Sequence, residues 1–85
     1  MQVLIPSALR SYTSRSRVEA SGPTLGEALA DLERQFPGIR FRMVDEQGKL
    51  RPHIAVFVGA KAVRDLATPV PPDTDVMIVA ALSGG

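Results

Sequence analysis

The sequence predicts a single α+β domain in which one main helix crosses one face of a mixed β-sheet. Two observations support this. A capped amphipathic helix pattern begins near residue 24, and short β-type segments both precede and follow it. A helical crossover between two strand pairs lets the first and last strands lie side by side at the centre of the sheet. The resulting order, β, β, α, β, a short segment and β, is that of the β-grasp arrangement.

The first two strands are predicted over residues 1–5 and 17–20, because inward apolar side chains alternate with outward ones in both segments. Pro6 limits further pairing after the first strand. The connection between them is a short polar loop around residues 11–16, which favours an antiparallel hairpin.

The main helix has the clearest sequence signals. Thr24, followed three residues later by Glu27, forms a capping box, in which each side chain can accept a hydrogen bond from the other residue's backbone N–H. Apolar residues then recur at helical spacing and predict one buried stripe: Leu25, Ala28, Leu29, Leu32 and Phe36. Pro37 and Gly38 end the helix.

The stretch after the helix is predicted to be irregular through Arg40, Arg42 and Asp45, with a turn at residues 47–48. The run over residues 54–58 is rich in β-branched and aromatic side chains, which suits a strand inside the sheet.

Gly59 can then supply a positive φ for a tight turn before a short segment at residues 62–66. A proline-rich loop follows. The last strand is predicted over residues 76–80, with Met77 and Val79 on its outward side.

Composition excludes several classes of function. The 85 residues carry a net charge of +1, which is far from the basic surface that nucleic-acid binding requires. The chain has no cysteine and a single histidine, His53, so neither a thiolate site nor a histidine metal site can be assembled. No catalytic constellation stands out either, so the chain is not expected to be an enzyme. No apolar run approaches a membrane span, and the cytoplasm is the expected location of a monomeric protein.

The end of the chain is the candidate site. We expect residues 1–81 to form the β-grasp domain and residues 82–85 to form a flexible Gly-Gly tail. A tail of this length spans about 13 Å when extended. Because glycine has no Cβ, Gly84 and Gly85 could pass through a narrow channel of a partner enzyme. The alternative is a frayed terminus, since a terminal glycine pair occurs by chance in roughly one chain in 200.

Several motifs extend this interpretation, and together they cover nearly the whole chain. They are Ile5–Arg10, Ala20–Gly22, Thr24–Gly26, Phe36–Ile39, Gly48–Leu50, Val56–Val58, Val63–Arg64 and Leu82–Gly85. In these motifs the sequence resembles the MoaD/ThiS family of ubiquitin-like sulfur carriers, and most of all its CysO branch. The chain end is the most specific of the matches.

The resemblance implies a reaction cycle at Gly85. A ubiquitin-activating-type enzyme would use ATP to adenylate its carboxylate, and a sulfurtransferase or persulfide donor would convert it to a thiocarboxylate. Leu82, Ser83 and Gly84 would thread the carboxylate into each partner, and no cofactor would be bound stably. A downstream synthase would accept the sulfur for cysteine, molybdopterin, thiamin thiazole or another sulfur-containing metabolite.

Leu4, Met77 and Val79 are expected to share the exposed face of the sheet, where the resemblance implies an apolar docking patch for the activating enzyme. Scattered surface apolar residues are the competing interpretation. Four arginines suggest either a basic rim for an acidic partner or a solvated face: Arg40, Arg42, Arg51 and Arg64. The family pattern is not followed at Ala55, at residues 59–62 or at residues 74–75, which concerns partner binding rather than tail chemistry.

Two further functions remain open from the sequence. The chain could be a ubiquitin-like modifier, in which Gly85 becomes joined to lysine amines of other proteins. It could also be a β-grasp interaction domain with an inert tail. Modification of lysines and sulfur transfer can coexist in one chain.

Overall fold

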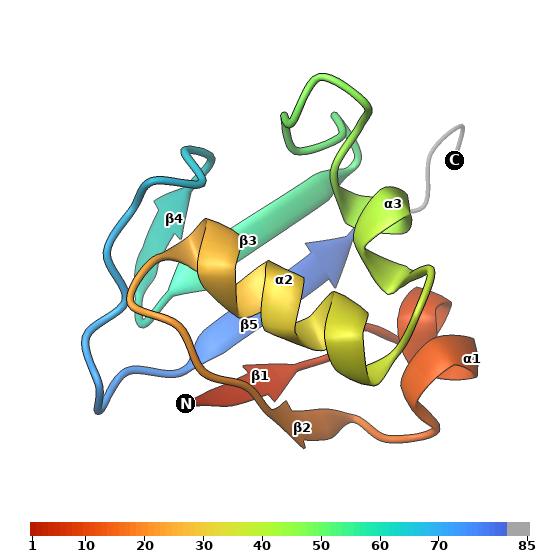
Figure 1. Ribbon diagram of the computed structural model, residues 1–85, viewed down its shortest axis with the longest axis horizontal. Helices are drawn as coiled ribbons and strands as arrows, with labels where there is room; N and C mark the ends of the chain where they lie inside the picture. The colour runs from red at the N-terminus through yellow and green to blue at the C-terminus, as the bar shows by residue number, and fades with distance from the viewer. Residues whose placement is uncertain (82–85) are drawn as a thin grey trace.

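The computed structural model describes residues 1–81, and Figure 1 shows their arrangement. The elements, in chain order, are β1 (Gln2–Leu4), the 3-10 helix η1 (Ser7–Leu9), α1 (Arg10–Thr13), β2 (Arg17–Glu19), α2 (Leu25–Gln35), α3 (Ile39–Met43), β3 (Ile54–Val58), β4 (Lys61–Val63) and β5 (Val76–Ala80). Within residues 1–81, no helix combines the length and the apolar character needed to cross a membrane.

The strands form one mixed sheet in the order β2-β1-β5-β3-β4. β1 and β5 run parallel at its centre, with Val3 opposite Val76, while the other neighbouring pairs are antiparallel. The parallel pair requires a crossover, and the segment that contains α2 provides it. The predicted α+β fold, with the first and last strands adjacent, is therefore confirmed.

α2 begins and ends as the sequence predicts, but the predicted capping box supplies only part of the hydrogen bonding at its N-terminus. The Glu27 N–H donates to Thr24 Oγ1 (3.3 Å), which is one half of the predicted capping box. The next free donors, the backbone N–H groups of Leu25 and Gly26, bind the carbonyl oxygens of Thr68 (2.9 Å) and Leu66 (2.8 Å). The loop after β4 thus satisfies donors that a helix leaves unpaired in its first turn.

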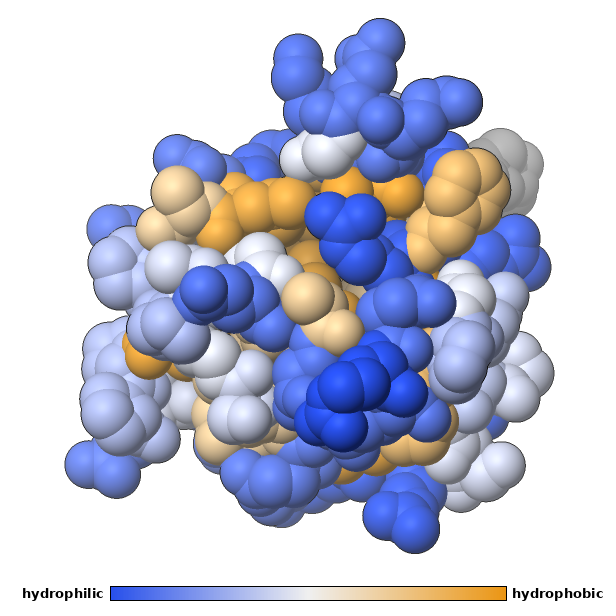
Figure 2. Space-filling model, viewed as in Figure 1, coloured by the Kyte–Doolittle hydropathy of each residue, from blue (hydrophilic) through white to orange (hydrophobic). Residues whose placement is uncertain are grey.

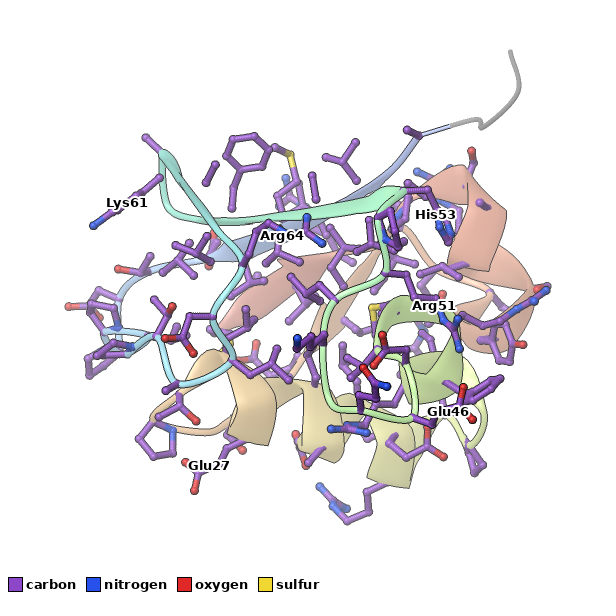
Figure 3. The ribbon with its side chains drawn as sticks, turned by 90° about the horizontal axis from the view of Figure 1, so that it is seen from above. Glu27, Glu46, Arg51, His53, Lys61 and Arg64 are labelled. Atoms are coloured by element: carbon purple, nitrogen blue, oxygen red, sulfur yellow. The ribbon has the colours of Figure 1, made fainter. Side chains whose placement is uncertain are left out.

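The core lies between α2, α3 and the inner face of the sheet. The sheet contributes the buried residues Ile54, Val56, Val58, Val76 and Ile78 of β3 and β5, and α2 contributes Leu25, Ala28, Leu29 and Leu32. Figure 3 shows α2 and α3 on one side of the sheet. The outward side chains of the same helices make the helix-covered surface mostly hydrophilic in Figure 2, as expected for an amphipathic helix.

Two stretches predicted as loops contain helical turns, so those predictions were wrong. α3 occupies the segment expected to be irregular, and Ile39 and Met43 are fully buried one helical turn apart. Its first turn is stabilised by Glu33, whose carboxylate accepts hydrogen bonds from the N–H groups of Gly38 (2.8 Å) and Arg40 (2.9 Å). These bonds lower the pKa of Glu33.

The other correction concerns the polar connection between β1 and β2, where η1 and α1 bury Leu9 and Thr13. Thr13 shares hydrogen bonds with the Arg15 backbone, and Ser14 adopts a positive φ of 58° that ends the turn. The short segment after Gly59 also starts earlier than predicted, because β4 pairs with β3 from Lys61 onward.

Candidate functional site

The tail leaves the domain at the end of β5. Ala80 is the last residue of the strand, and the N–H of Ala81 donates to the His53 carbonyl oxygen (2.8 Å). This bond fixes the point from which the chain continues. The predicted chemical group at Gly85 and the predicted threading residues Leu82, Ser83 and Gly84 lie outside the described residues, so their roles stay predictions.

The outer face of the sheet carries the three residues predicted to dock a partner. The strand register places Met77 of β5 directly between Leu4 of β1 and Phe57 of β3. Val79 lies further along β5, opposite Ala55. Directly opposed side chains on one face of a sheet lie about 5 Å apart at their Cβ atoms, so these residues form a continuous surface.

We call this surface the outer-face patch: Leu4, Ala55, Phe57, Met77 and Val79. Met77 is 39% exposed and Val79 38% exposed, and the other three side chains are half-buried. Phe57 is the member that the sequence reasoning missed. The alternation of burial within Ile54–Val58 places residue 57 on the outward side, and the antiparallel register shows that it adjoins Met77.

A pocket of about 450 Å³ lies at the C-terminal end of β5, and we call it the root pocket. Its lining combines α3, the segment before β3, η1 and the last residues of β5: Ala8, Leu9, Phe41, Arg42, Glu46, Arg51, His53, Ile54, Ala80 and Ala81. Figure 3 shows Arg51, His53 and Glu46 at this end of the molecule and Lys61 at the opposite end. The root pocket therefore adjoins the outer-face patch only through the strand ends.

Three of the four arginines predicted as a possible rim have different surroundings, and the fourth, Arg40, donates its backbone N–H to Glu33. Arg64 donates to the carbonyl oxygens of Ile54 (2.9 Å), Leu50 (2.9 Å) and Arg51 (3.1 Å), so it holds the segment before β3 in place. Arg51 bonds to the carbonyl oxygen of Phe41 and lies over its ring. Arg42 is exposed and lines the root pocket.

Within residues 1–81, no group of three or more histidine, cysteine, aspartate or glutamate side chains could hold a metal ion. His53 contributes its backbone carbonyl to Ala81 and its side chain to the lining of the root pocket. The described residues thus offer surfaces for contact with other molecules.

Comparison with known proteins identifies the family. The ThiS family model matches residues 3–85, nearly the whole chain. The chain belongs to the ThiS family. The sulfur carrier protein CysO of Mycobacterium tuberculosis is 38% identical to it over 89 aligned residues, which cover 98% of this chain and 96% of the relative.

Solved structures agree with this membership. A chain of the Amycolatopsis orientalis BexX/CysO complex superimposes with a TM-score of 0.90 at 35% identity, covering 99% of the ThiS-family chain described here and 98% of the other. SAMP1 from Haloferax volcanii superimposes with a TM-score of 0.80 at 25% identity, covering 100% and 98%. The predicted β-grasp, ubiquitin-like fold is confirmed.

ThiS-family and CysO-type carriers are small protein substrates rather than catalysts. The prediction that this ThiS-family chain is not itself an enzyme is therefore confirmed by its membership.

Proposed function

We propose that this chain is a sulfur carrier that works through the carboxylate of Gly85. The observation that carries the proposal is the match to the ThiS family and to a sulfur carrier protein over nearly the full length, chain end included. The described domain supports it by ending β5 at Ala80, five residues before Gly85, so that Ala81 and residues 82–85 follow the strand. Those residues can extend about 13 Å from the body.

The chemistry explains why such a carrier needs partners. A carboxylate is a poor electrophile, because its two oxygens share a negative charge that repels nucleophiles and neither oxygen can leave as a stable anion. An adenylating enzyme of the ubiquitin-activating type would join the Gly85 carboxylate to AMP with release of pyrophosphate. The outer sulfur of a persulfide on a sulfurtransferase or other donor would then attack the acyl-adenylate and release AMP, forming an acyl disulfide. A second thiol would cleave the S–S bond of that disulfide, leaving the thiocarboxylate on Gly85 and a disulfide on the donor. The anionic sulfur of the thiocarboxylate is a strong nucleophile at neutral pH, as a thiolate is.

We assign docking of the activating enzyme to the outer-face patch. Met77 and Val79 stay more than one third exposed on a face that no helix covers, and Phe57 and Leu4 extend the apolar surface on either side of Met77. Apolar and aromatic side chains concentrate at the centres of protein interfaces. A partner seated there would lie beside the strand that leads into the tail.

The final step of the proposed cycle is transfer of the sulfur from the thiocarboxylate to an acceptor enzyme. Similarity to CysO favours a synthase that assembles cysteine, and the same thiocarboxylate could serve another sulfur-containing cofactor or metabolite. Because the activating partner consumes ATP, we expect the cycle to run in the cytoplasm.

The decisive experiment is reconstitution of the loading step. The full chain is incubated with its adenylating enzyme, ATP and a sulfur source, and its intact mass is measured. We expect the mass to rise by the difference between sulfur and oxygen, and fragmentation to place the new atom at Gly85. A chain lacking Gly84 and Gly85 is the matched control and should stay unchanged. Absence of any mass gain in the full chain, with an enzyme that loads a known carrier, would overturn the proposal.

A second function is favoured by one observation, the similarity to SAMP1, a small archaeal modifier protein. The same activated Gly85 could be attacked by a lysine amine instead of sulfur, forming an isopeptide bond with loss of AMP. Tryptic digestion of cell extracts followed by mass spectrometry would reveal lysines of other proteins that carry residues 65–85 of this chain as a remnant, because Arg64 is its last basic residue. Such remnants should disappear when Gly85 is deleted.

A further inference from the structure

Two contacts to Phe41 hold Arg51 in one orientation. The Nε–H of Arg51 donates to the Phe41 carbonyl oxygen (2.7 Å), and its guanidinium carbon lies 4.6 Å from the centroid of the Phe41 ring. The first contact uses one of the five N–H donors of the side chain. The remaining donors form a planar pair of arms whose geometry matches the two oxygens of a carboxylate. Arg51 is thus oriented in advance for a carboxylate ligand.

Phe41 is itself exposed to an unusual degree. The buried residues of α3, Ile39 and Met43, face the core, while the side chain of Phe41 remains 61% exposed. Leaving a large aromatic ring in water is unfavourable, and an arginine over the ring offsets only part of this. Aromatic residues and arginine are both enriched where protein interfaces are buried. The pair therefore has the composition of an interface anchor.

The charges around the pair favour an acidic ligand. The root pocket is lined by Arg42 and Arg51 together with one acid, Glu46. Within residues 1–81, neither arginine forms an ion pair. The nearby Asp45 is engaged in its own turn, where its carboxylate accepts hydrogen bonds from the N–H groups of Gln47 (2.8 Å) and Lys49 (3.0 Å). Among residues 1–81 no carboxylate lies within ion-pair distance of Arg51, although its positive charge is near enough to help lower the pKa of Asp45.

The position of the Phe41–Arg51 pair indicates what it could bind. Ala80 and Ala81 line the same pocket as Phe41 and Arg51, so the pair stands next to the point at which the chain leaves β5. Figure 1 shows that β5 points toward the end of the molecule where α3 lies. A protein that binds the chain just beyond residue 81 would therefore lie next to the root pocket.

We propose that the root pocket is a second docking surface, separate from the outer-face patch, which receives an acidic segment of a partner protein. One carboxylate of that segment binds the oriented guanidinium of Arg51 through two hydrogen bonds. The neighbouring part of the segment packs against the Phe41 ring, and Arg42 adds a second positive charge at the rim. The inference concerns recognition and does not require the sulfur chemistry proposed above.

The test uses the full chain labelled with 15N and a capped tetraglutamate peptide as the probe. Backbone amide resonances are followed during titration, with a capped tetraglutamine peptide of the same length as the matched control. We expect saturable shifts centred on residues 41, 42, 51 and 53 with the acidic peptide, and binding weaker by at least about fivefold with the neutral one. Equal binding of both peptides, or shifts spread evenly over the surface, would overturn the proposal.

Three variants sharpen the result. Arg51→Gln and Arg51→Lys should each weaken tetraglutamate binding by about three- to fivefold, because lysine keeps the charge but cannot present two parallel donors. Arg17→Gln removes the same charge from the exposed edge strand β2 and should leave binding unchanged. If Arg51→Lys binds as tightly as the original chain, the two-bond contact is refuted.

Two further measurements distinguish an acidic protein segment from other possible occupants of the root pocket. Inorganic phosphate that shifts the same resonances as tightly as the peptide would identify a small-anion site and overturn the assignment to a protein segment. A chain lacking Gly84 and Gly85 should give the same resonances and the same peptide affinity. If deletion instead shifts the resonances of residues 41 and 51 and strengthens peptide binding, the pocket is occupied by the chain's own end and the proposal fails.

Discussion

The two faces of the sheet are built from alternate residues of the same strands, yet they differ sharply in what covers them. On β5, Ile78 points inward and is 2% exposed, whereas its neighbour Val79 points outward and is 38% exposed. The inner face is closed by α2 and α3, and among residues 1–81 no helix lies over the outer face (Figure 3). Both faces nevertheless carry apolar side chains.

This contrast teaches that the two sets of apolar residues have different functions. Burial on the inner face removes apolar area from water and supplies the driving force for folding, at about 25 cal/mol per Å². The outer-face patch gains little of that stabilisation, because its central residues stay in contact with water. Burial of the outer-face patch is expected to contribute free energy to binding when a partner protein covers it.

The largest expected effect separates these two roles on a single strand. Ile78→Ala should lower the free energy of unfolding by about 2–5 kcal/mol, because it removes buried methylene groups and leaves a cavity. Val79→Ala should lower it by less than about 1 kcal/mol, since the valine is partly exposed already. Urea denaturation of both variants measures the difference.

The same pair also tests the docking role. Val79→Ala should raise the KM of the loading reaction for the carrier while the folded spectrum stays unchanged. Equal losses of stability in the two variants, or an unchanged KM for Val79→Ala, would erase the distinction between the faces.

An intermediate effect is expected at Arg64, which braces the segment leading into β3. Arg64→Gln removes hydrogen bonds to three backbone carbonyl groups and should lower the free energy of unfolding by about 1–2 kcal/mol, because part of this site is open to solvent. Arg42→Gln removes the same charge from an exposed position and should leave stability within about 0.5 kcal/mol. Thermal unfolding at low salt compares them. Similar losses of stability in both variants would show that the positive charge of Arg64, rather than its hydrogen bonds to the backbone, stabilises the fold.

The smallest expected effect is on the hydrogen bonds between Glu33 and the first turn of α3, which helps to cover the inner face, and this effect depends on pH. Backbone N–H groups of Gly38 and Arg40 lower the pKa of Glu33 below its ordinary value of 4.5. Because the folded state favours the ionised form, this stabilisation is present above pH 4.5 and is lost as the pH falls through the lowered pKa.

Glu33→Gln should therefore be slightly less stable than the original chain at neutral pH, and the two should converge in acid. Thermal unfolding measured across this pH range gives the difference. Glu46→Gln is the control, because within residues 1–81 the Glu46 carboxylate accepts no such backbone bond. A constant gap between Glu33→Gln and the original chain at all pH values would contradict the assignment.

Much of the inner face could be predicted from sequence because its signals are periodic. The stripe of α2 and the alternation over residues 76–80 each repeat often enough to indicate both the element and its buried side, whereas the continuous apolar run over residues 54–58 indicated a strand without showing which side is buried. The position of β1 beside β5 followed from the helical crossover between them. The family resemblance then pointed to the chain end, which no periodic pattern could have identified.

The elements that were missed are too short to show a period. α3 has one inward pair, Ile39 and Met43, and it begins after Gly38 without a capping side chain of its own. Its stabilising group, the Glu33 carboxylate, belongs to α2 and reaches it only in the folded chain. Because α3 was not foreseen, neither was the exposed ring of Phe41 or the arginine that lies over it.

The central place of β5 also sets the timing of folding. β1 and β3 have no direct pairing and are joined only through the last strand of the domain. During synthesis the sheet therefore stays in two halves until residues 76–80 have emerged, and contacts so distant in sequence form slowly. A chain interrupted before that strand would expose two unmatched edges, which invites degradation or aggregation. The sheet is therefore complete only once the strand that leads into the tail has been synthesised.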